Sequence, residues 1–312
     1  MVFEEYMMER DGFSGCYAAP DDADKNTKAV IVMSCEERGG FSGRMAAERF
    51  AEYGFAALAV NLSGVKGMPE TPDRIPLEIF APVIRILKEG KGFTSISTYG
   101  VSTGSVFAAL AARYYPGMEK VILVSPTHVV PGCASKKKKK DAGHSMATMD
   151  GEELPFVPVD FSARKPEKTY KDEDTGREGL GMWFSYSDAY DARENVEKAY
   201  LRLEETGADI LLLASMQDEM WPADYSIKYM KRRLERSDYD KDVRVVLYEK
   251  GSHLLGVMPN RKKYPQIYRK IPSLSKVFRN LKESRAESFV ALRRSEKEVI
   301  RFLKGREETE EK

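Results

Sequence analysis

The sequence predicts an α/β fold, in which helices cover both faces of a mostly parallel central sheet. Short apolar runs typical of strands alternate along the chain with longer helix-like segments, and this alternation is the pattern of parallel strands joined by helical crossovers. Runs such as residues 29–33 are continuously hydrophobic, as expected of strands buried on both faces. The 312 residues are long for one domain but within the range of α/β proteins. We therefore expect residues 1–312 to form a single domain.

The first part of the chain is expected to supply the edge and the first parallel strands of the sheet. Residues 1–19 contain two strand-like stretches joined at Arg10-Asp11-Gly12, a turn signal typical of hairpins. Gly54 follows a helix-like segment, and a glycine commonly ends a helix because it adopts the left-handed conformation there. The predicted elements are strands over 15–19, 29–33 and 55–60 and helices over 44–53 and 77–88, the last despite Pro82.

The stretch Gly100-Val101-Ser102-Thr103-Gly104 is the first candidate for chemistry. It follows residues 94–99, which are rich in β-branched and aromatic residues, and it precedes the alanine-rich residues 106–112. A G-x-S-x-G sequence between a strand and a helix predicts a nucleophile elbow, a sharp turn that presents the serine hydroxyl above the sheet edge. The two glycines remove Cβ atoms that would collide where strand and helix pack closely. The alternative is a glycine-rich turn without chemistry.

One long stretch interrupts the alternation of strands and helices. Residues 131–182 are rich in proline, glycine and lysine and show little periodicity. A segment this long without regular structure inside a compact domain is functional or disordered, so we expect a cap or lid over the strand ends, with a solvated mobile insert as the alternative. The elements predicted around it are strands over 120–125, 208–214 and 243–248 and helices over 192–206, 223–236 and 286–303.

A serine nucleophile requires a base within hydrogen-bonding reach, and the chain has three histidines, His128, His144 and His253. His253 is the predicted base because it follows the last predicted strand, and parallel sheets bind their ligands at the carboxyl ends of the strands. We expect His128 to be a polar residue that lines the pocket and His144 to be exposed.

The base in turn requires an acid that orients it. Asp218 is the predicted acid because it follows the strand before the one that delivers His253, and Glu219 is the alternative. An ordinary polar loop or a helix N-cap would explain either residue without chemistry. The chain order Ser102, Asp218, His253 is the order found in the α/β-hydrolase fold. Three such residues at three strand ends are far more specific than any one of them.

A tetrahedral intermediate requires backbone N–H donors around its oxyanion. One is expected from Thr103, directly after the nucleophile. The other is expected from the loop that follows residues 29–33, from Cys35 or Glu36. For the side chain of Cys35 we favour a small buried thiol without a role.

Composition argues against several other classes of function. The 50 basic and 49 acidic residues leave a net charge of +1, which provides no general attraction to nucleic acid or to an anionic membrane. The three cysteines lack the spacing of a metal site and indicate a reducing compartment. No signal-peptide pattern is present, and no stretch approaches 18 apolar residues. We therefore expect a cytoplasmic protein that uses no metal and no cofactor and binds neither membrane nor nucleic acid.

Several segments together carry a resemblance to a known family. They are Arg38-Gly39-Gly40-Phe41, Tyr53-Gly54-Phe55-Ala56-Ala57-Leu58-Ala59, Gly100-Val101-Ser102-Thr103-Gly104, Val196-Glu197-Lys198-Ala199, Leu211-Leu212-Leu213 through Asp218 to Trp221, and Gly251-Ser252-His253. Over residues 12–303 the chain resembles the catalytic domain shared by acyl-CoA thioesterases and bile acid-CoA:amino acid N-acyltransferase, which is related to dienelactone hydrolases. The triad of that family maps onto Ser102, Asp218 and His253.

The resemblance implies a serine hydrolase that cleaves an acyl thioester or ester through an acyl-enzyme, with a small acyl ester or an acyl-CoA as substrate. The acyltransferase member of the family uses cysteine as its nucleophile, so serine favours hydrolysis over transfer to an amine. A general carboxylesterase or dienelactone hydrolase-like enzyme and, from another class, a ligand-binding protein on this fold are the alternatives. The sequence does not predict the acyl chain, the leaving group or the oligomeric state. Weak candidates for contacts with the phosphates of CoA are Lys136, Lys137, Lys138, Lys139 and Lys140. A solvated loop is the alternative explanation for this run of lysines.

Overall fold

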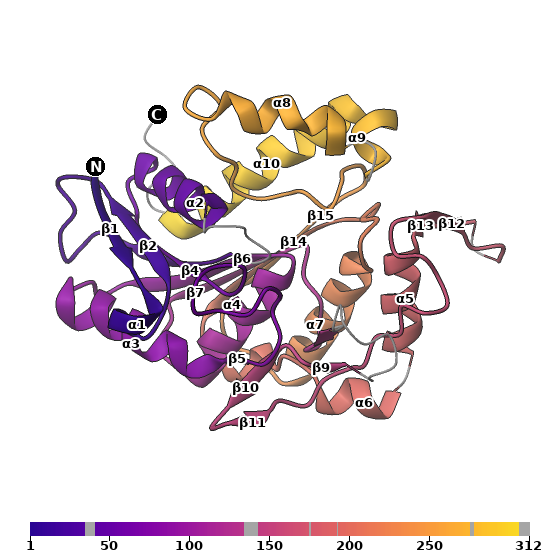
Figure 1. Ribbon diagram of the computed structural model, residues 1–312, viewed down its shortest axis with the longest axis horizontal. Helices are drawn as coiled ribbons and strands as arrows, with labels where there is room; N and C mark the ends of the chain where they lie inside the picture. Colours follow the sequence, from indigo (N-terminus) through magenta and orange to yellow (C-terminus); the bar gives the residue numbers. More distant parts are fainter. Residues whose placement is uncertain (35–40, 134–142, 175, 192, 275–277, 306–312) are drawn as a thin grey trace.

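The computed structural model describes residues 1–34, 41–133, 143–174, 176–191, 193–274 and 278–305. It has the predicted α/β architecture, a central sheet between layers of helices (Figure 1). Within these residues the main sheet has eight strands in the order β1-β2-β4-β3-β6-β7-β14-β15. The strands from β4 to β15 run parallel to one another, and β2 pairs antiparallel with both β1 and β4. The mostly parallel sheet is therefore confirmed.

The strand predictions agree with the structure to within one or two residues at most ends. The turn at Arg10-Asp11-Gly12 joins two antiparallel strands as expected, although the connection also contains a short helix, α1 (Met8–Asp11). The strands of the main sheet are β1 (Val2–Tyr6), β2 (Gly15–Ala19), β3 (Ala29–Ser34), β4 (Ala56–Asn61), β6 (Ile96–Val101), β7 (Lys120–Val124), β14 (Asp209–Ser215) and β15 (Val243–Tyr248).

Alternate residues of the central strands belong to two separate hydrophobic clusters, because successive side chains of a strand point to opposite faces. In β3, Ile31 and Met33 belong to one cluster and Val30 and Val32 to the other. The first cluster includes residues from α3 (Phe80–Arg85), α4 (Thr103–Tyr114) and α7 (Ala223–Arg236). The second includes residues from α2 (Phe41–Glu52) and α10 (Arg285–Lys304). Helices therefore cover both faces of the sheet, as predicted.

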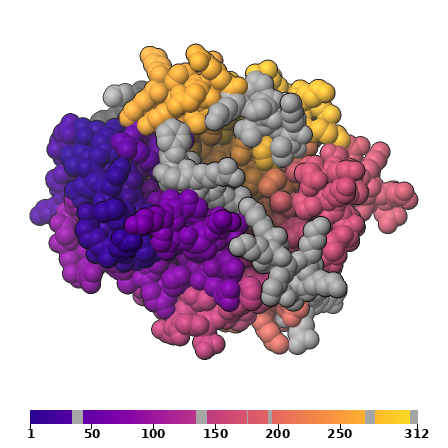
Figure 2. All heavy atoms as spheres, in the orientation of Figure 1, coloured from indigo at the N-terminus to yellow at the C-terminus, as the bar shows by residue number. Residues whose placement is uncertain are grey.

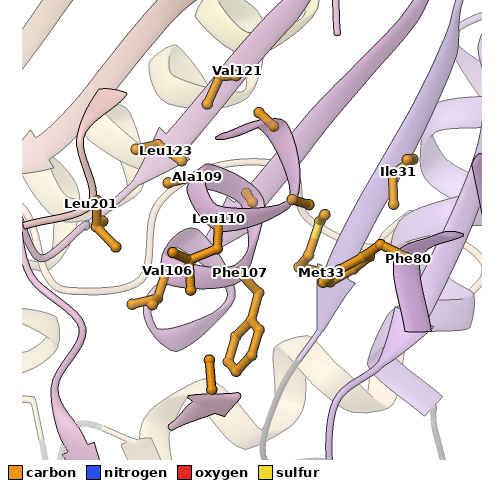
Figure 3. Packing of buried hydrophobic residues seen from close by; sticks show 14 of the residues in the cluster. Ile31, Met33, Phe80, Val106, Phe107, Ala109, Leu110, Val121, Leu123 and Leu201 are labelled. Carbon is orange, nitrogen blue, oxygen red and sulfur yellow. The ribbon is translucent and has the colours of Figure 1, made fainter. Parts of the chain in front are cut away.

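Helix α4 packs closely on the middle of the sheet, and this contact positions the candidate nucleophile. Figure 3 shows Val106, Phe107 and Leu110 of α4 near Met33 of β3 and Leu123 of β7. Residues 104–112 of the helix are buried. Because several of them are alanines with small side chains, the helix can approach the strands closely. The start of α4 is thereby held at the carboxyl end of β6.

Two helix predictions were wrong in detail. Residues 77–88 form a short 3₁₀ segment, η1 (Leu77–Ile79), then α3 and a π-helical turn, η2 (Ile86–Gly90). Residues 192–206 do not form one helix: between α6 (Arg193–Lys198) and η3 (Leu203–Glu205), Tyr200 forms an antiparallel bridge with Val129 and Arg202 is left-handed, with φ 51°. The N–H of Leu201 donates to the carbonyl of His128, and the N–H of Val130 donates to the carbonyl of Ala199. This strand-like pairing with a distant segment replaces the helical hydrogen bonds.

Within the described residues of the 131–182 stretch, short strand pairs occur where we expected no regular structure. They are β8 (Gly132–Cys133) with β9 (His144–Ser145), β10 (Ala147–Met149) with β11 (Glu152–Glu153) and β5 (Ile75–Pro76), and β12 (Thr169–Lys171) with β13 (Glu178–Leu180). The end of the stretch contacts the loop after β14, where Leu180 N–H donates to the Glu219 carbonyl. That contact agrees with a position near the strand ends, and a lid role stays a prediction.

The remaining helices complete the chain. Helix α5 (Gly181–Tyr190) begins at the end of the 131–182 stretch, and α8 (Pro265–Leu274) and α9 (Asn280–Glu283) precede α10. Figure 2 shows the C-terminal segments, coloured orange to yellow, along the top of one face of the molecule. In the part of the chain that the structure describes, no helix combines the length and apolar character needed to cross a membrane.

Candidate active site

Ser102 occupies a sharp turn between β6 and α4. Its φ of 56° lies in the left-handed region, and its ψ is −129°. Such a conformation is costly for a residue with a side chain and persists only where the surroundings enforce it. Here the Ser102 N–H donates to the Val124 carbonyl at 2.9 Å, and the Ser102 carbonyl accepts from the Ser105 hydroxyl at 2.6 Å. The turn is the strained elbow that the sequence predicts.

The two glycines of the elbow are required by close backbone contacts. A Cβ on Gly100 would lie 2.1 Å from the carbonyl oxygen of Gly104, and a Cβ on Gly104 would lie 2.4 Å from the carbonyl oxygen of Met33. Backbone oxygens cannot move aside as the end of a flexible side chain can. The spacing of the two glycines around Ser102 thus follows from the packing of β6, α4 and β3.

His253 connects Ser102 to the buried carboxylate of Asp218. Its Nε2 lies 2.8 Å from the Ser102 Oγ, and its Nδ1 lies 2.7 Å from the Asp218 Oδ2. The His253 residue is 4% exposed and Asp218 is 1% exposed, whereas Ser102 is partly exposed. The structure therefore brings together the three residues predicted from the sequence, each in a segment that follows the carboxyl end of a parallel strand.

The second oxygen of Asp218 is held by the backbone of its own loop. Oδ1 accepts from the N–H of Met220 at 2.9 Å and from the N–H of Trp221 at 3.4 Å. With Oδ1 occupied by these donors, Oδ2 faces His253. The backbone of the loop thus fixes the orientation of the Asp218 carboxylate toward His253.

Aromatic side chains enclose the imidazole of His253. The Trp221 ring meets it edge to face with centroids 5.6 Å apart, and the Phe278 ring lies nearly parallel to it at 6.4 Å. The Trp221 Nε1–H donates to the Ser125 carbonyl at 2.9 Å, and the Ser125 hydroxyl donates to the His253 carbonyl at 2.8 Å. Ser125, directly after β7, thus ties the acid loop to the histidine loop.

Further residues that sequence reasoning missed hold the same two loops. The Asn280 side-chain amide donates to the carbonyls of Gln217 at 2.7 Å and Gly251 at 3.1 Å. Arg177 directs its guanidinium at the Asp218 carbonyl, 3.4 Å away. No local sequence signal identifies these contacts, because each joins segments far apart in the chain.

The predicted oxyanion donors are described only in part. Thr103 is the first residue of α4, and N–H groups in the first turn of a helix have no partner within that helix. The positive end of the helix dipole also lies there, which favours negative charge beside Ser102. Cys35 and Glu36 lie outside the described residues, as do Lys136, Lys137, Lys138, Lys139 and Lys140.

The other two histidines lie away from this arrangement. His128 does not line a pocket as predicted: it is 1% exposed, its Nδ1 lies 3.0 Å from the Ser226 hydroxyl, and three tyrosine rings surround it. Burial lowers the pKa of His128 to about 3, so the ring is neutral. His144 is partly exposed and contacts Glu153 at 3.1 Å.

Glu219, the alternative acid, does not contact His253. Its Oε2 accepts from the Asn280 N–H at 3.3 Å. Burial raises the pKa of Glu219 to about 7, with a smaller contribution from the charge of Asp218. The geometry therefore selects Asp218 over Glu219 as the partner of the histidine.

A parallel sheet covered on both faces, a strained serine elbow and a Ser–His–Asp contact in this chain order define an α/β hydrolase. A family model described as BAAT / acyl-CoA thioester hydrolase C terminal matches residues 75–262. The match covers more than half of the chain and includes Ser102, Asp218 and His253. The chain belongs to this family, as the sequence resemblance predicts.

Solved structures with a similar fold include several hydrolases. Est1E from Butyrivibrio proteoclasticus is 16% identical, with a TM-score of 0.43 over 86% of this chain and 96% of that one. An alpha-beta serine hydrolase homologue from Coxiella burnetii is 13% identical, with a TM-score of 0.41 over 80% and 88%. An acylaminoacyl peptidase from Pyrococcus horikoshii is 15% identical, with a TM-score of 0.46 over 77% of this chain but 35% of that one. No curated protein sequence matches the chain.

Proposed function

We propose that this α/β hydrolase is a serine hydrolase that cleaves an acyl thioester or ester through an acyl-enzyme. Ser102 is the nucleophile, His253 the general base and Asp218 the group that orients the imidazole. The observation that carries the proposal is the continuous hydrogen-bonded path from Ser102 Oγ through His253 to Asp218, with contacts of 2.8 and 2.7 Å. Two of the three side chains, those of His253 and Asp218, are buried.

The orientation of His253 sets the direction of proton transfer. With Nδ1–H donating to Asp218, the lone pair of Nε2 faces the Ser102 hydroxyl and can accept its proton. As the Oγ–carbon bond forms, the carbonyl electrons move to oxygen and the Ser102 proton moves to Nε2. When the intermediate collapses, the bond from the acyl carbon to sulfur or oxygen breaks and the imidazolium returns its proton to the leaving group. Water, activated by the same imidazole, then releases the acid and restores Ser102.

The negative charge that forms on the carbonyl oxygen needs donors that are already in place. The Thr103 N–H is the donor that we assign from the described residues, since it begins α4 beside the nucleophile. The second donor is proposed to be the backbone N–H of Cys35 or Glu36, which follow β3 in the sequence. Removal of one such donor typically costs about 10²–10³-fold in kcat.

The family match supports an acyl thioester such as an acyl-CoA as substrate, and the serine nucleophile supports water as the acceptor. The experiment that tests the proposal is labelling with a fluorophosphonate probe, followed by rate measurements with acyl-CoAs of several chain lengths and with short p-nitrophenyl esters. We expect labelling of the wild-type protein and none of the Ser102→Ala variant. A wild-type protein that neither labels nor hydrolyses any of these substrates would instead be a ligand-binding protein on this fold. We expect the enzyme to act in the cytoplasm.

Transfer of the acyl group to an amine is the second candidate, because the sequence resembles a group that includes bile acid-CoA:amino acid N-acyltransferase and the matching family carries BAAT in its description. Addition of glycine or taurine to the acyl-CoA reaction distinguishes the two. We expect free acid as the product at every amine concentration. Accumulation of an N-acyl amino acid at the expense of the free acid would reassign the enzyme as a transferase.

A further inference from the structure

A cavity of about 680 Å³ lies outside the catalytic residues, since its lining includes none of Ser102, Asp218 and His253. Helix α10 forms one wall, and the segment 258–262 and Tyr268 of α8 form the others, with Arg49 of α2 at the margin. The α10 residues that line the cavity occupy positions 285, 289, 292, 293 and 296, a spacing that places them on one face of a helix. The volume falls within the range of about 300–1,000 Å³ typical of small-molecule sites.

The charge around this cavity is strongly one-sided. Among the described residues, no carboxylate lies within ion-pair distance of Arg261, Lys262, Arg285 or Arg293, all of which line it. Glu296 is the only acid among the described residues of the lining. It is already neutralised, since its Oε1 accepts from Arg49 at 2.8 Å and from the Tyr53 hydroxyl at 3.0 Å. The whole chain has a net charge of only +1. A concave wall concentrates the field of its charges, and the field of these cations favours an anion.

The cavity also offers flat apolar surfaces beside the cations. The guanidinium of Arg261 lies 5.7 Å from the centroid of the Tyr268 ring, and that of Arg285 lies 5.9 Å from the Phe289 ring. Both rings are partly buried, and Leu292 adds aliphatic surface to the same lining. An aromatic face can stack on a nucleobase, and arginine can bind phosphate oxygens with two parallel hydrogen bonds.

We propose that this cavity binds a phosphorylated nucleoside, with its phosphates on the arginines and its base against Tyr268 or Phe289. The site is distinct from the Ser102 site but close to it: Tyr268 and Phe289 pack against the cluster of Phe278 and Leu281, and Phe278 lies parallel to the His253 ring. The ligand is either the nucleotide end of an acyl-CoA or a separate nucleotide that regulates the enzyme. The proposal concerns binding and does not depend on the proposed hydrolysis.

Isothermal titration of the full-length protein with ADP tests the proposal. We expect ADP to bind, adenosine to bind at least about tenfold more weakly, and the affinity for ADP to fall as salt screens the arginines. The double variant Arg285→Ser/Arg293→Ser should weaken ADP binding at least tenfold. The matched control, Arg294→Ser/Lys297→Ser, removes two exposed cations of the same helix that do not line the cavity and should change the affinity less than twofold.

Several outcomes would overturn the proposal. Failure of the wild-type protein to bind ADP would refute it, as would an equal effect of the two double variants. Pyrophosphate binding as tightly as ADP would refute the nucleoside part and leave only an anion site. Thermal unfolding of each variant establishes that it is folded. If Arg285→Ser/Arg293→Ser does not fold, the single variant Arg261→Ser replaces it.

Wild-type kinetics then distinguish the two sources of the ligand. ADP that competes with an acyl-CoA and leaves hydrolysis of a p-nitrophenyl ester unchanged would identify the nucleotide end of the substrate. ADP that changes the rate at saturating p-nitrophenyl ester would identify a separate effector. The binding measurement requires no catalysis, so a protein that binds ADP but hydrolyses nothing would refute the proposed function alone.

Discussion

The substitution Asp218→Asn tests how the histidine is oriented, and the structure predicts which way the new amide will face. Oδ1 of Asp218 accepts from two backbone N–H groups, of Met220 and Trp221. The amide oxygen of asparagine must take this place, because an NH₂ group there would oppose two donors. The NH₂ group therefore replaces Oδ2, 2.7 Å from Nδ1 of His253. Its N–H then donates to Nδ1, the imidazole proton moves to Nε2, and His253 can no longer accept a proton from Ser102.

The size of the effect follows from the free energy needed to reverse the new side-chain amide in the Asp218→Asn variant. Reversing the amide leaves the two backbone donors without a partner, at about 1–3 kcal/mol each for buried groups. The productive tautomer is thus disfavoured by about 2–6 kcal/mol, which corresponds to a loss of about 30-fold to about 3 × 10⁴-fold in kcat. The upper end agrees with the loss of about 10⁴-fold that the same substitution causes in a serine protease triad.

The assay is kcat/KM for an acyl-CoA and for p-nitrophenyl acetate, with thermal unfolding to check the fold. Asp209→Asn is the matched control, because Asp209 begins the strand β14 whose other end leads to Asp218. We expect the control to change kcat/KM less than twofold. If Asp218→Asn stays within tenfold of the wild type while its unfolding temperature is unchanged, the assignment of Asp218 as the orienting acid is wrong.

Three further substitutions test the packing and the buried ionisable groups. Gly104→Ala places a Cβ 2.4 Å from a backbone oxygen, so it should lower stability by about 1–3 kcal/mol and reduce activity. In the control Gly90→Ala, the new Cβ meets no atom within 4 Å. Equal effects of the two substitutions on the unfolding temperature would contradict this. The pKa of His128 is lowered from 6.5 to about 3, so below pH 6.5 the unfolded chain binds a proton that the folded chain does not, and the free energy of unfolding falls. Between pH 7 and pH 5, His128→Asn should lose about 2 kcal/mol less of its free energy of unfolding than the wild type, as measured by urea unfolding. His144→Asn is the control. The pKa of Glu219 is raised from 4.5 to about 7, so its ionisation lowers the free energy of unfolding as the pH rises through this window. After allowance for solvent screening, Glu219→Gln should be about 1–2 kcal/mol more stable than the wild type at pH 8. A stability difference that does not change with pH would refute this.

The positions of the strands along the chain and the elbow could be read from the sequence because their signals are local. A buried strand needs a continuous apolar run, and the elbow needs glycines on both sides of Ser102, so the chemistry of each is contained in a few adjacent residues. His253 and Asp218 could also be predicted, because parallel strands deliver their following residues to one edge of the sheet. The sequence alone thus determined the fold class, the strand positions and three candidate residues.

The tertiary structure decided what depends on contacts between distant segments. The helix predicted over 192–206 breaks because residues 199 and 201 pair with the backbone of residues 128–130, a partner that no local pattern reveals. The choice of Asp218 over its neighbour Glu219 was decided in the same way, by which carboxylate faces the imidazole. The contacts of Asn280 join three parts of the chain at once. A hydrogen bond between segments tens or hundreds of residues apart exists only when the fold brings them together, so periodicity and motif spacing carry no signal for it.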